Sequence, residues 1–188
     1  MAEAARQSAP AAARAAGSTD DLRIGAVRAL LAPQFLVEEL PVDEAARATV
    51  AGARQAIHRV LHGADDRLVA VVGPCSIHDR EAALEYARRL AAEAARHDAE
   101  LLVVMRVYFE KPRTTVGWKG FVNDPRLDGS FDMNAGLRQA RALLLEVNRL
   151  GLPCGTEFLD LLSPQYLSDL IAWGAIGART TESQSHRQ

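Results

Sequence analysis

The sequence lacks any apolar run long enough to cross a membrane, and it lacks an excess of charge of either sign. No stretch approaches the ~18 consecutive apolar residues that a membrane-spanning helix needs. The 22 basic and 24 acidic residues leave a formal net charge of -2. Without a global basic field, nucleic acid is not an expected partner. We therefore expect a protein that binds neither a membrane nor a nucleic acid.

Cysteine is also scarce, with only Cys75 and Cys154 in 188 residues. The pair matches no disulfide framework and no CxxC motif. Residues 1–17 contain no continuous apolar segment of the kind found in a secretory signal. These features predict a reducing, cytoplasmic location. We expect residues 1–17 to be a disordered Ala-rich tail and residues 18–66 to be an N-terminal arm and helix.

Lysine is the scarcest charged residue. Only Lys111 and Lys119 occur among the 22 basic residues, and both fall in one short stretch. Lysine offers a compact, mobile ammonium group where arginine offers a planar fork. The clustering therefore indicates either chance or a local need for that ammonium group.

Apolar periodicity and breakers predict alternating strands and helices. Residues 18–42 are expected to form an arm without a core element. Start signals precede three helices, at Asp43, at the capping-box-like sequence 76–79 and at Ser163-Pro164. The predicted helices are 43–61, 80–96, 137–150 and 163–173. The predicted strands are 68–72, 101–107, 154–158 and 175–180.

Four alternations of strand and helix predict a parallel sheet built from right-handed βαβ units. A doubly wound sheet and a (β/α)8 barrel are the two candidate architectures. No Gly-rich phosphate loop follows the first strand, which disfavours the dinucleotide-binding version of the doubly wound sheet. Residues 68–188 cover about half of the ~250 residues that a complete barrel takes. The sequence therefore predicts about the first four β/α units of a barrel.

The carboxyl ends of the predicted strands carry polar side chains that are poor choices for a core. Cys75 follows the first strand, Arg106 ends the second, Glu157 lies in the third and Arg179 ends the fourth, so the four should converge on one rim. Arg106 needs an anionic partner, either Glu157 or a ligand. Two arginines and Lys111 exceed what one glutamate neutralises, which favours a doubly charged ligand such as a phosphate.

Other readings of these segments stay open. Cys75 is a metal ligand, a nucleophile or a small buried apolar residue, and the last is the most common. His78 is expected near the start of a helix, and Cys154 in the core. The connection 109–134 is long for a βα loop, which is typical of a functional loop. Its cations, hydroxyls and glycines suit a phosphate, whereas the alternative is a solvated loop.

Four longer strings resemble the class I 3-deoxy-D-arabino-heptulosonate 7-phosphate (DAHP) synthases. They are GPCSIHD (73–79), MRVYFEKPRTTVGWKG (105–120), GLPCGTEFLD (151–160) and WGAIGARTTESQ (173–184), and the resemblance runs from about Asp20 to the last residue. It implies a (β/α)8 barrel with an N-terminal extension, of which residues 67–188 are the first half. It also implies condensation of phosphoenolpyruvate with erythrose 4-phosphate to give DAHP and phosphate, the first step of the shikimate pathway.

The resemblance assigns roles to individual residues. Arg106 and Lys111 are implied as the catalytic residues, and Cys75 as a ligand of a divalent metal of the Mn, Fe, Co or Zn class. The implied phosphoenolpyruvate site consists of Arg106, Lys111, Glu157, Ala178 and Arg179. Arg113 and Thr114 match the erythrose 4-phosphate site. The remaining metal ligands of the family lie on later strands, so we expect the isolated chain to be incomplete as a catalyst.

The resemblance also implies partners. The segment 20–23 corresponds to an arm used for subunit contacts, which predicts a homo-oligomer. Leu161 and Gln165 fall in the region where an aromatic amino acid acts as feedback effector. Two functions remain possible: a DAHP synthase, or a non-catalytic half-barrel that binds phosphoenolpyruvate or associates with an intact synthase as a regulatory or relic subunit.

Overall fold

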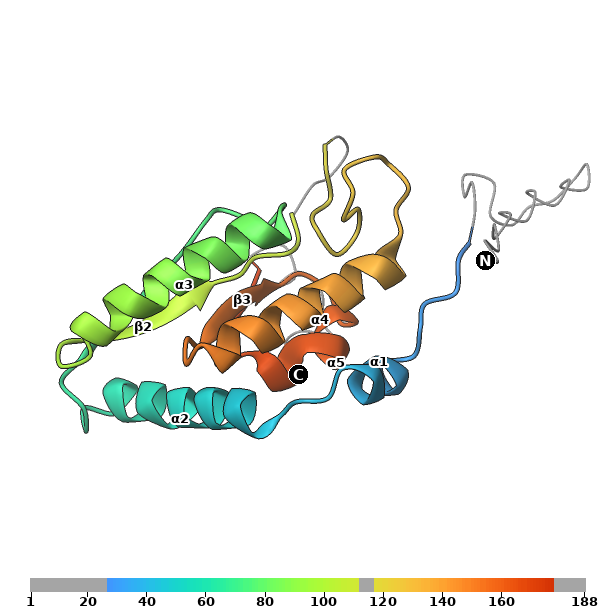
Figure 1. Cartoon of the computed structure of the whole chain (residues 1–188). Coiled ribbons are helices and arrows are strands. Elements are labelled where there is room, and N and C mark those ends of the chain that lie inside the picture. The colour runs from blue at the N-terminus through green and yellow to red at the C-terminus, as the bar shows by residue number, and fades with distance from the viewer. Residues whose placement is uncertain (1–26, 112–116, 178–188) are drawn as a thin grey trace, which may run out of the picture. The chain divides into compact units, whose positions relative to one another are not determined.

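The computed structural model describes residues 27–111 and 117–177, and the described residues from Leu31 onwards form one compact unit. Strands and helices alternate along the chain (Figure 1). In chain order the elements are α1 (Pro33–Glu39), α2 (Glu44–Leu61), β1 (Leu68–Val72), α3 (Arg80–Arg96), β2 (Leu101–Arg106), α4 (Met133–Arg149), β3 (Cys154–Phe158), α5 (Ser163–Leu167), the 3-10 helix η1 (Ser168–Leu170) and β4 (Trp173–Ile176). No described helix is long and apolar enough to cross a membrane.

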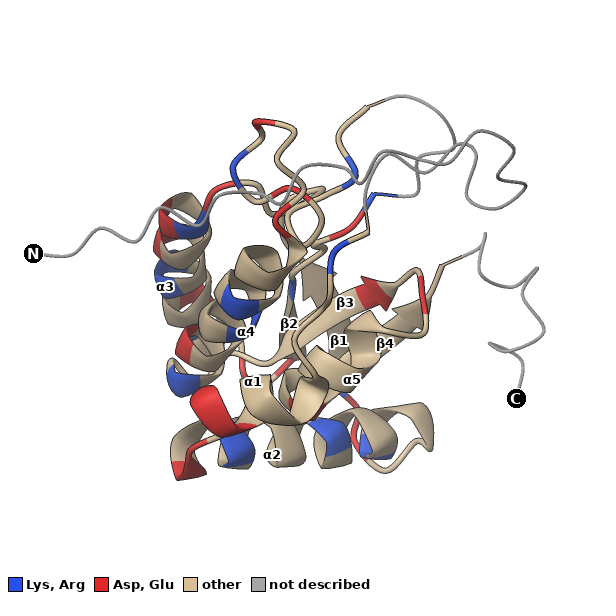
Figure 2. Cartoon of the chain, turned by 90° about the vertical axis from the view of Figure 1, so that its right-hand side faces the viewer, with Lys and Arg blue, Asp and Glu red and all other residues tan. Residues whose placement is uncertain are grey.

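The four strands form one parallel sheet in the order β1-β2-β3-β4, which confirms the predicted parallel arrangement. Each strand lies beside the one that precedes it in the chain, with a helix in each connection. Helices α3 and α4 lie side by side against β2 and β3 (Figure 1). Helix α2 lies at the end of the sheet opposite the long 107–132 connection (Figure 2). The carboxyl ends of the strands therefore face that connection.

The main core fills the space between the sheet and helices α3 and α4. Met105 of β2 is fully buried there, as are Leu143 and Leu144 of α4, whereas Val104 packs in a second cluster with residues of α2. Cys154 at the start of β3 is fully buried in the same core, as predicted. Each such side chain contributes ~1.5–3 kcal/mol relative to an exposed position. This packing holds the strands that carry the candidate residues at their carboxyl ends.

Helices α2 and α3 follow the sequence signals closely. The carboxylate of Asp43 accepts a hydrogen bond from Ala46 N at 2.9 Å and starts α2. Helix α3 has the predicted bounds, but its cap differs from the predicted capping box. Asp79 is the cap, because its carboxylate accepts from Ala82 N at 2.9 Å, and Ser76 lies outside the helix. His78 is exposed just before α3, as expected.

The second half of the chain departs further from the prediction. Helix α4 begins at Met133 rather than at residue 137, because Asp132 caps it through Ala135 N. The predicted helix 163–173 is shorter: α5 ends at Leu167, η1 follows, and Trp173 already belongs to β4. Pairing of Trp173 with Gly155 starts this strand early. Residues 178–180 of the predicted fourth strand lie outside the described residues.

The expectation of an arm without a core element is wrong for residues 31–42. Helix α1 lies there, and its Leu36 is 1% exposed within the main core. The chain just before α1 is fixed as well, because Tyr166 Oη donates to Leu31 O at 2.6 Å. The predicted tail at residues 1–17 lies outside the described residues. Residues 31–42 are thus a packed part of the compact unit that begins at Leu31.

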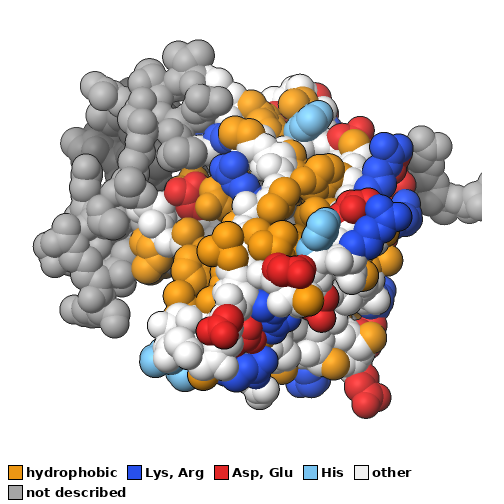
Figure 3. Space-filling view, turned by 90° about the vertical axis from the view of Figure 1, so that its left-hand side faces the viewer, with side chains coloured by type: hydrophobic (Ala, Val, Ile, Leu, Met, Phe, Trp, Pro, Cys, Tyr) orange, Lys and Arg blue, Asp and Glu red, His pale blue; other side chains and the backbone are white. Residues whose placement is uncertain are grey.

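The two outer strands of the described sheet expose apolar side chains. Leu68, Val71 and Val72 of β1 are 66%, 42% and 39% exposed, and Ile176 of β4 is 54% exposed. Among the described strands, β1 pairs only with β2, and β4 pairs only with β3. Apolar side chains gather in a band on one face of the molecule (Figure 3). These features belong to a sheet with two open edges.

Candidate active site

A thiol and an ammonium group meet where the carboxyl ends of β1 and β2 approach each other. The Lys111 ammonium group donates to Cys75 Sγ at 3.1 Å and to Cys75 O at 3.2 Å. Cys75 is exposed, which excludes the reading as a small buried apolar residue. The hydrogen bond from Lys111 and then its charge lower the pKa of the Cys75 thiol, with a smaller contribution from Arg106. A thiolate is the reactive and metal-binding form of cysteine.

Arg106 brings a second cation to this rim. Its guanidinium group lies over the Tyr108 ring, 4.0 Å from the centroid. Its Nε is buried and has no hydrogen-bond partner among the described residues. Gly73 allows the close approach of β1 and β2 here, because a Cβ at that position would lie 2.6 Å from Arg106 O. A buried guanidinium nitrogen without a partner is costly unless it meets an acceptor.

Glu157 lies at the carboxyl end of β3, beside Ala175 of β4. Its Oε1 faces Gly177, where an added Cβ would come within 3.0 Å of that oxygen. None of the ion pairs between described residues joins Glu157 to Arg106. The internal ion pair that the sequence left open is therefore not formed in the described part of the chain. Arg106 keeps its capacity for an external anion.

Four of the predicted site residues fall in segments that the structure does not describe. Arg113, Thr114, Ala178 and Arg179 all lie outside the described residues. Within the 109–134 connection, Phe121 and Val122 are packed rather than solvated, since they are 2% and 1% exposed. The solvated-loop alternative is thus wrong for residues 120–122, whereas residues 126–129 of the connection are exposed.

A metal site is not complete within residues 27–111 and 117–177. No group of three or more His, Cys, Asp or Glu side chains there is arranged to hold a metal ion. Cys75, with its lowered thiol pKa, offers one ligand. One ligand cannot hold a catalytic metal, which needs three or more from the protein. The described residues alone therefore do not fit a resident metal.

A second polar cluster, which the sequence analysis missed, lies next to Lys111. Glu110 is only 8% exposed, and its Oε2 accepts from Ser163 Oγ at 3.1 Å. Ser163 Oγ also lies 2.9 Å from Asp160 Oδ1. Burial and then the charge of Asp160 raise the pKa of Glu110 to about 7. The sequence gives only a weak signal for this cluster. Glu110 is a carboxylate directly after the apolar Phe109, and it lies in a segment whose functional prediction is based on its cations.

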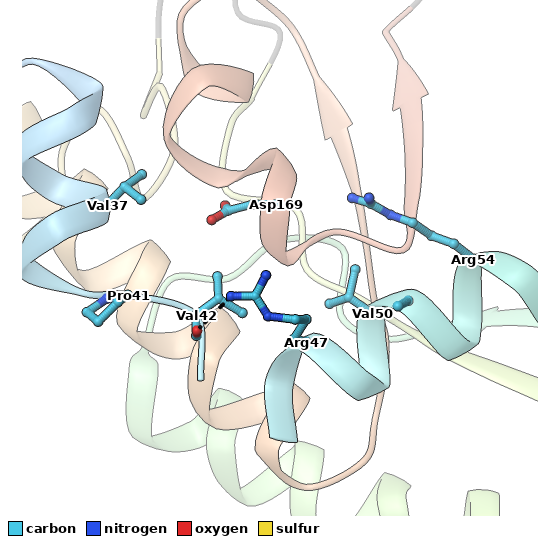
Figure 4. Close-up of a pocket in the computed structure, with 8 residues that line it drawn as sticks. Val37, Pro41, Val42, Arg47, Val50, Arg54 and Asp169 are labelled. Carbon is cyan, nitrogen blue, oxygen red and sulfur yellow. Dashed lines mark hydrogen bonds between the residues drawn. The ribbon is translucent and has the colours of Figure 1, made fainter. Parts of the chain in front are cut away.

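A groove of about 400 Å³ lies away from this rim, between α1, α2 and η1 (Figure 4). It is lined by Val37, Pro41, Val42, Arg47, Val50, Ala51, Arg54 and Asp169. Its charged groups are largely engaged within the protein: Arg54 donates to Ile171 O and Ser168 O, and Asp169 accepts from buried Arg141. None of the candidate residues lines it. The groove and the candidate residues therefore lie in different places. We assign the candidate site from the chemistry of its residues rather than from the groove.

Comparison with known proteins identifies the class to which this fold and rim belong. The profile of the DAHP synthetase I family matches residues 39–188. The chain is 62% identical over 169 residues to the Phe-sensitive phospho-2-dehydro-3-deoxyheptonate aldolase of Escherichia coli K12, covering 90% of this chain and 48% of that protein. It is 59% identical to the phospho-2-dehydro-3-deoxyheptonate aldolase of Amycolatopsis methanolica, covering 90% of this chain and 83% of that one.

A solved structure gives the same answer for the fold. The phospho-2-dehydro-3-deoxyheptonate aldolase of Francisella tularensis superposes with a TM-score of 0.84 at 52% identity, covering 87% of this chain and 48% of that one. The chain belongs to the DAHP synthetase I family. Its four-stranded sheet is half of a (β/α)8 barrel, as predicted. The chain spans about half the length of the relatives from Escherichia coli and Francisella tularensis.

Proposed function

We propose that this chain supplies the phosphoenolpyruvate-binding half of a DAHP synthase. The observation that carries the proposal is the buried Nε of Arg106, which has no partner among the described residues, on the rim where the ammonium group of Lys111 meets Cys75. Phosphoenolpyruvate carries a phosphate and a carboxylate, and paired cations suit both groups. Membership of the DAHP synthetase I family supports the same ligand.

In the proposed reaction, the methylene carbon of phosphoenolpyruvate attacks the aldehyde carbon of erythrose 4-phosphate. Water then adds to the cationic C2 centre, and inorganic phosphate leaves. Arg106 and Lys111 bind the phosphoenolpyruvate anion and fix its methylene group, which lowers the entropic part of the barrier. Glu157, Ala178 and Arg179 complete this subsite in the proposal, and Arg113 and Thr114 bind the phosphate of erythrose 4-phosphate.

Cys75 is proposed as the one ligand that the described residues contribute to a divalent metal. When bound, such a metal supplies Lewis acidity toward a substrate oxygen. Its other ligands must come from outside residues 27–111 and 117–177. In the chain by itself, the hydrogen bond from Lys111 keeps the Cys75 thiol ready for deprotonation.

Binding of phosphoenolpyruvate tests the proposal most directly. Isothermal titration calorimetry on the 188-residue chain should detect the ligand, and Arg106→Gln should weaken binding at least about tenfold because a charged hydrogen bond is lost. Arg89→Gln is a matched control, since Arg89 is 79% exposed on α3. No binding by a soluble wild-type chain would refute the proposal.

Turnover separates the enzyme from the second candidate, a non-catalytic half-barrel. The open edges at β1 and β4 favour that candidate, because exposed apolar strands suit association with another chain. The assay follows loss of phosphoenolpyruvate with erythrose 4-phosphate and Mn²⁺, with and without a chelator. Metal-dependent turnover supports a synthase, whereas binding without turnover supports the half-barrel.

We also propose a homo-oligomer that uses the segment 20–23, and an aromatic amino acid as effector near Leu161 and Gln165. A relative named as Phe-sensitive supports the choice of effector. Leu161 is 48% exposed, and Gln165 Nε2 donates to Leu161 O at 3.1 Å. Phenylalanine should therefore protect this region from hydrogen exchange, and light scattering should give the mass of an oligomer. Failure of both measurements would remove this part of the proposal.

A further inference from the structure

The residue before Lys111 is held in a short backbone ribbon. Glu110 pairs with Gly120 in an antiparallel bridge, and Lys111 N donates to Lys119 O at 2.9 Å. Gly120 has φ +112, and a Cβ there would lie 2.3 Å from Phe109 O, so the ribbon requires glycine. Whatever fixes Glu110 therefore fixes the start of the Lys111 side chain.

The carboxyl group of Glu110 shares one hydroxyl with Asp160, and it also hydrogen-bonds to the Asp160 side chain and the Leu159 backbone. Ser163 Oγ lies 3.1 Å from Glu110 Oε2 and 2.9 Å from Asp160 Oδ1. A serine hydroxyl has a single proton and can donate to only one of these oxygens. If both carboxyl groups were ionised, one of them would face the oxygen of Ser163 without a proton between them. A second proton is therefore needed in the cluster.

The surroundings of the two carboxyl groups decide where that proton resides. Asp160 Oδ1 also accepts from Leu162 N at 2.9 Å and Ser163 N at 2.7 Å, so two backbone donors already face this oxygen. Burial and then the charge of Asp160 favour the protonated form of Glu110, and they outweigh the hydrogen bonds from Ser163 and the Leu159 backbone, which favour its ionised form. The neighbouring Lys111 directs its ammonium group to Cys75 instead. The second proton therefore belongs on Glu110.

We propose that Glu110 is a protonated positioning residue for Lys111. Its carboxylic acid donates to Ser163 Oγ, and Ser163 in turn donates to the carboxylate of Asp160. This Glu110–Ser163–Asp160 chain ties the ribbon that carries Lys111 to the start of α5. Loss of the proton places two carboxylates around one hydroxyl and loosens the tie. The pKa of about 7 puts this change near neutrality.

The consequence for ligand binding rests on the proposed function. Rising pH should displace Lys111 and weaken its hold on phosphoenolpyruvate, beyond any effect of the ionisation of the ligand itself. Glutamine at position 110 stays neutral and keeps a donor for Ser163, so Glu110→Gln should remove this extra pH dependence. Glu110→Ala removes the tie altogether and should weaken binding about tenfold at low and high pH alike.

The first test measures the protonation of the Glu110 side chain and needs no ligand. Carbon-13 NMR of the side-chain carboxyl groups in the 188-residue chain, titrated between about pH 5 and pH 9, should show one glutamate with a midpoint near 7 that disappears in Glu110→Gln. Glu85→Gln, which changes an exposed side chain on α3, should leave that resonance in place. An ordinary midpoint for Glu110 would overturn the proposal.

The second test measures positioning through phosphoenolpyruvate affinity, by calorimetry at about pH 6 and about pH 8. The ratio of the two affinities should be several-fold larger for the wild type than for Glu110→Gln, whereas Glu85→Gln should match the wild type. Equal ratios for wild type and Glu110→Gln would refute the positioning role. If Glu110 titrates near 7 but neither the wild type nor any variant binds phosphoenolpyruvate, the proposed function fails. The assignment of the proton to Glu110 would still hold in that case.

Discussion

At the scale of single residues, Glu110 makes stability depend on pH. Its pKa is about 7 in the folded chain against an ordinary value of 4.5. Between these values the folded state holds a proton that the unfolded state has lost, so the free energy of unfolding falls as pH rises and levels off above 7. The loss should be about 3 kcal/mol.

Urea denaturation of the wild type and of Glu110→Gln across this range measures that dependence. The difference between the two should change between about pH 4.5 and about pH 7 and stay constant above it. Parallel curves throughout would contradict the assignment of the proton to Glu110. The measurement needs neither ligand nor metal.

Cys75 should react faster than an ordinary thiol, because Lys111 lowers its pKa. Lys111→Met removes the hydrogen bond and the charge, so the pH–rate profile for alkylation by iodoacetamide should shift to higher pH. Cys154 provides an internal control, because it is fully buried and burial strongly raises the pKa of its thiol. An unchanged profile in Lys111→Met would show that the two groups are not in contact in solution.

At the scale of elements, Arg141 joins α4 to the segments on either side of it. Its fully buried guanidinium group donates to both oxygens of Asp169, to Leu40 O and to Tyr166 O. Asp169→Ala leaves this charge without its counterion and should cost ~3 kcal/mol of unfolding free energy. The control is Glu93→Ala, which removes an exposed pair with Arg96 and should cost under ~0.5 kcal/mol. Equal costs would show that solvent reaches Arg141.

The elements also show what the sequence could predict. Where a local signal sets the boundary, the prediction holds: β1 and β3 have the expected bounds, and Asp43 starts α2. Where a boundary depends on contacts between distant segments, it fails. Ser163 looks like a helix cap but turns its hydroxyl to Glu110, 53 positions earlier in the chain. Helix α1 has no side-chain cap, and its place in the core depends on Leu36 reaching distant partners.

The residues of the candidate site also fall into those that the sequence could predict and those that it could not. Cys75 and Arg106 are conspicuous in sequence because polar residues at strand ends are poor core residues, and the parallel sheet does bring them to one rim with Lys111. The shared proton of Glu110 is not readable from sequence, because it depends on a hydroxyl and a second carboxylate placed by β3 and α5. Its burial, too, follows only from the packed connection around Phe121.

At the scale of the whole molecule, the exposed apolar side chains of β1 and β4 predict association. Val71 and Ile176 are 42% and 54% exposed on strands that have one paired neighbour each in the described sheet. Open, apolar edges pair readily with other strands. Sedimentation of the 188-residue chain should therefore show self-association that rises with concentration, and Ile176→Lys should reduce it. A monomer at all concentrations would mean that these strands are covered in solution.

The order of the strands also determines when each contact can form during synthesis. Because β1 to β4 are neighbours in chain order, each strand can add to the sheet as it leaves the ribosome. The contact of Cys75 with Lys111 needs only the first two strands and the ribbon at Gly120. The partner that holds Glu110 is made 53 residues later, which is a few seconds at about 5–20 residues per second. On the nascent chain, the contact between Cys75 and Lys111 can therefore form before the hydrogen bond from Ser163 that holds Glu110 in place.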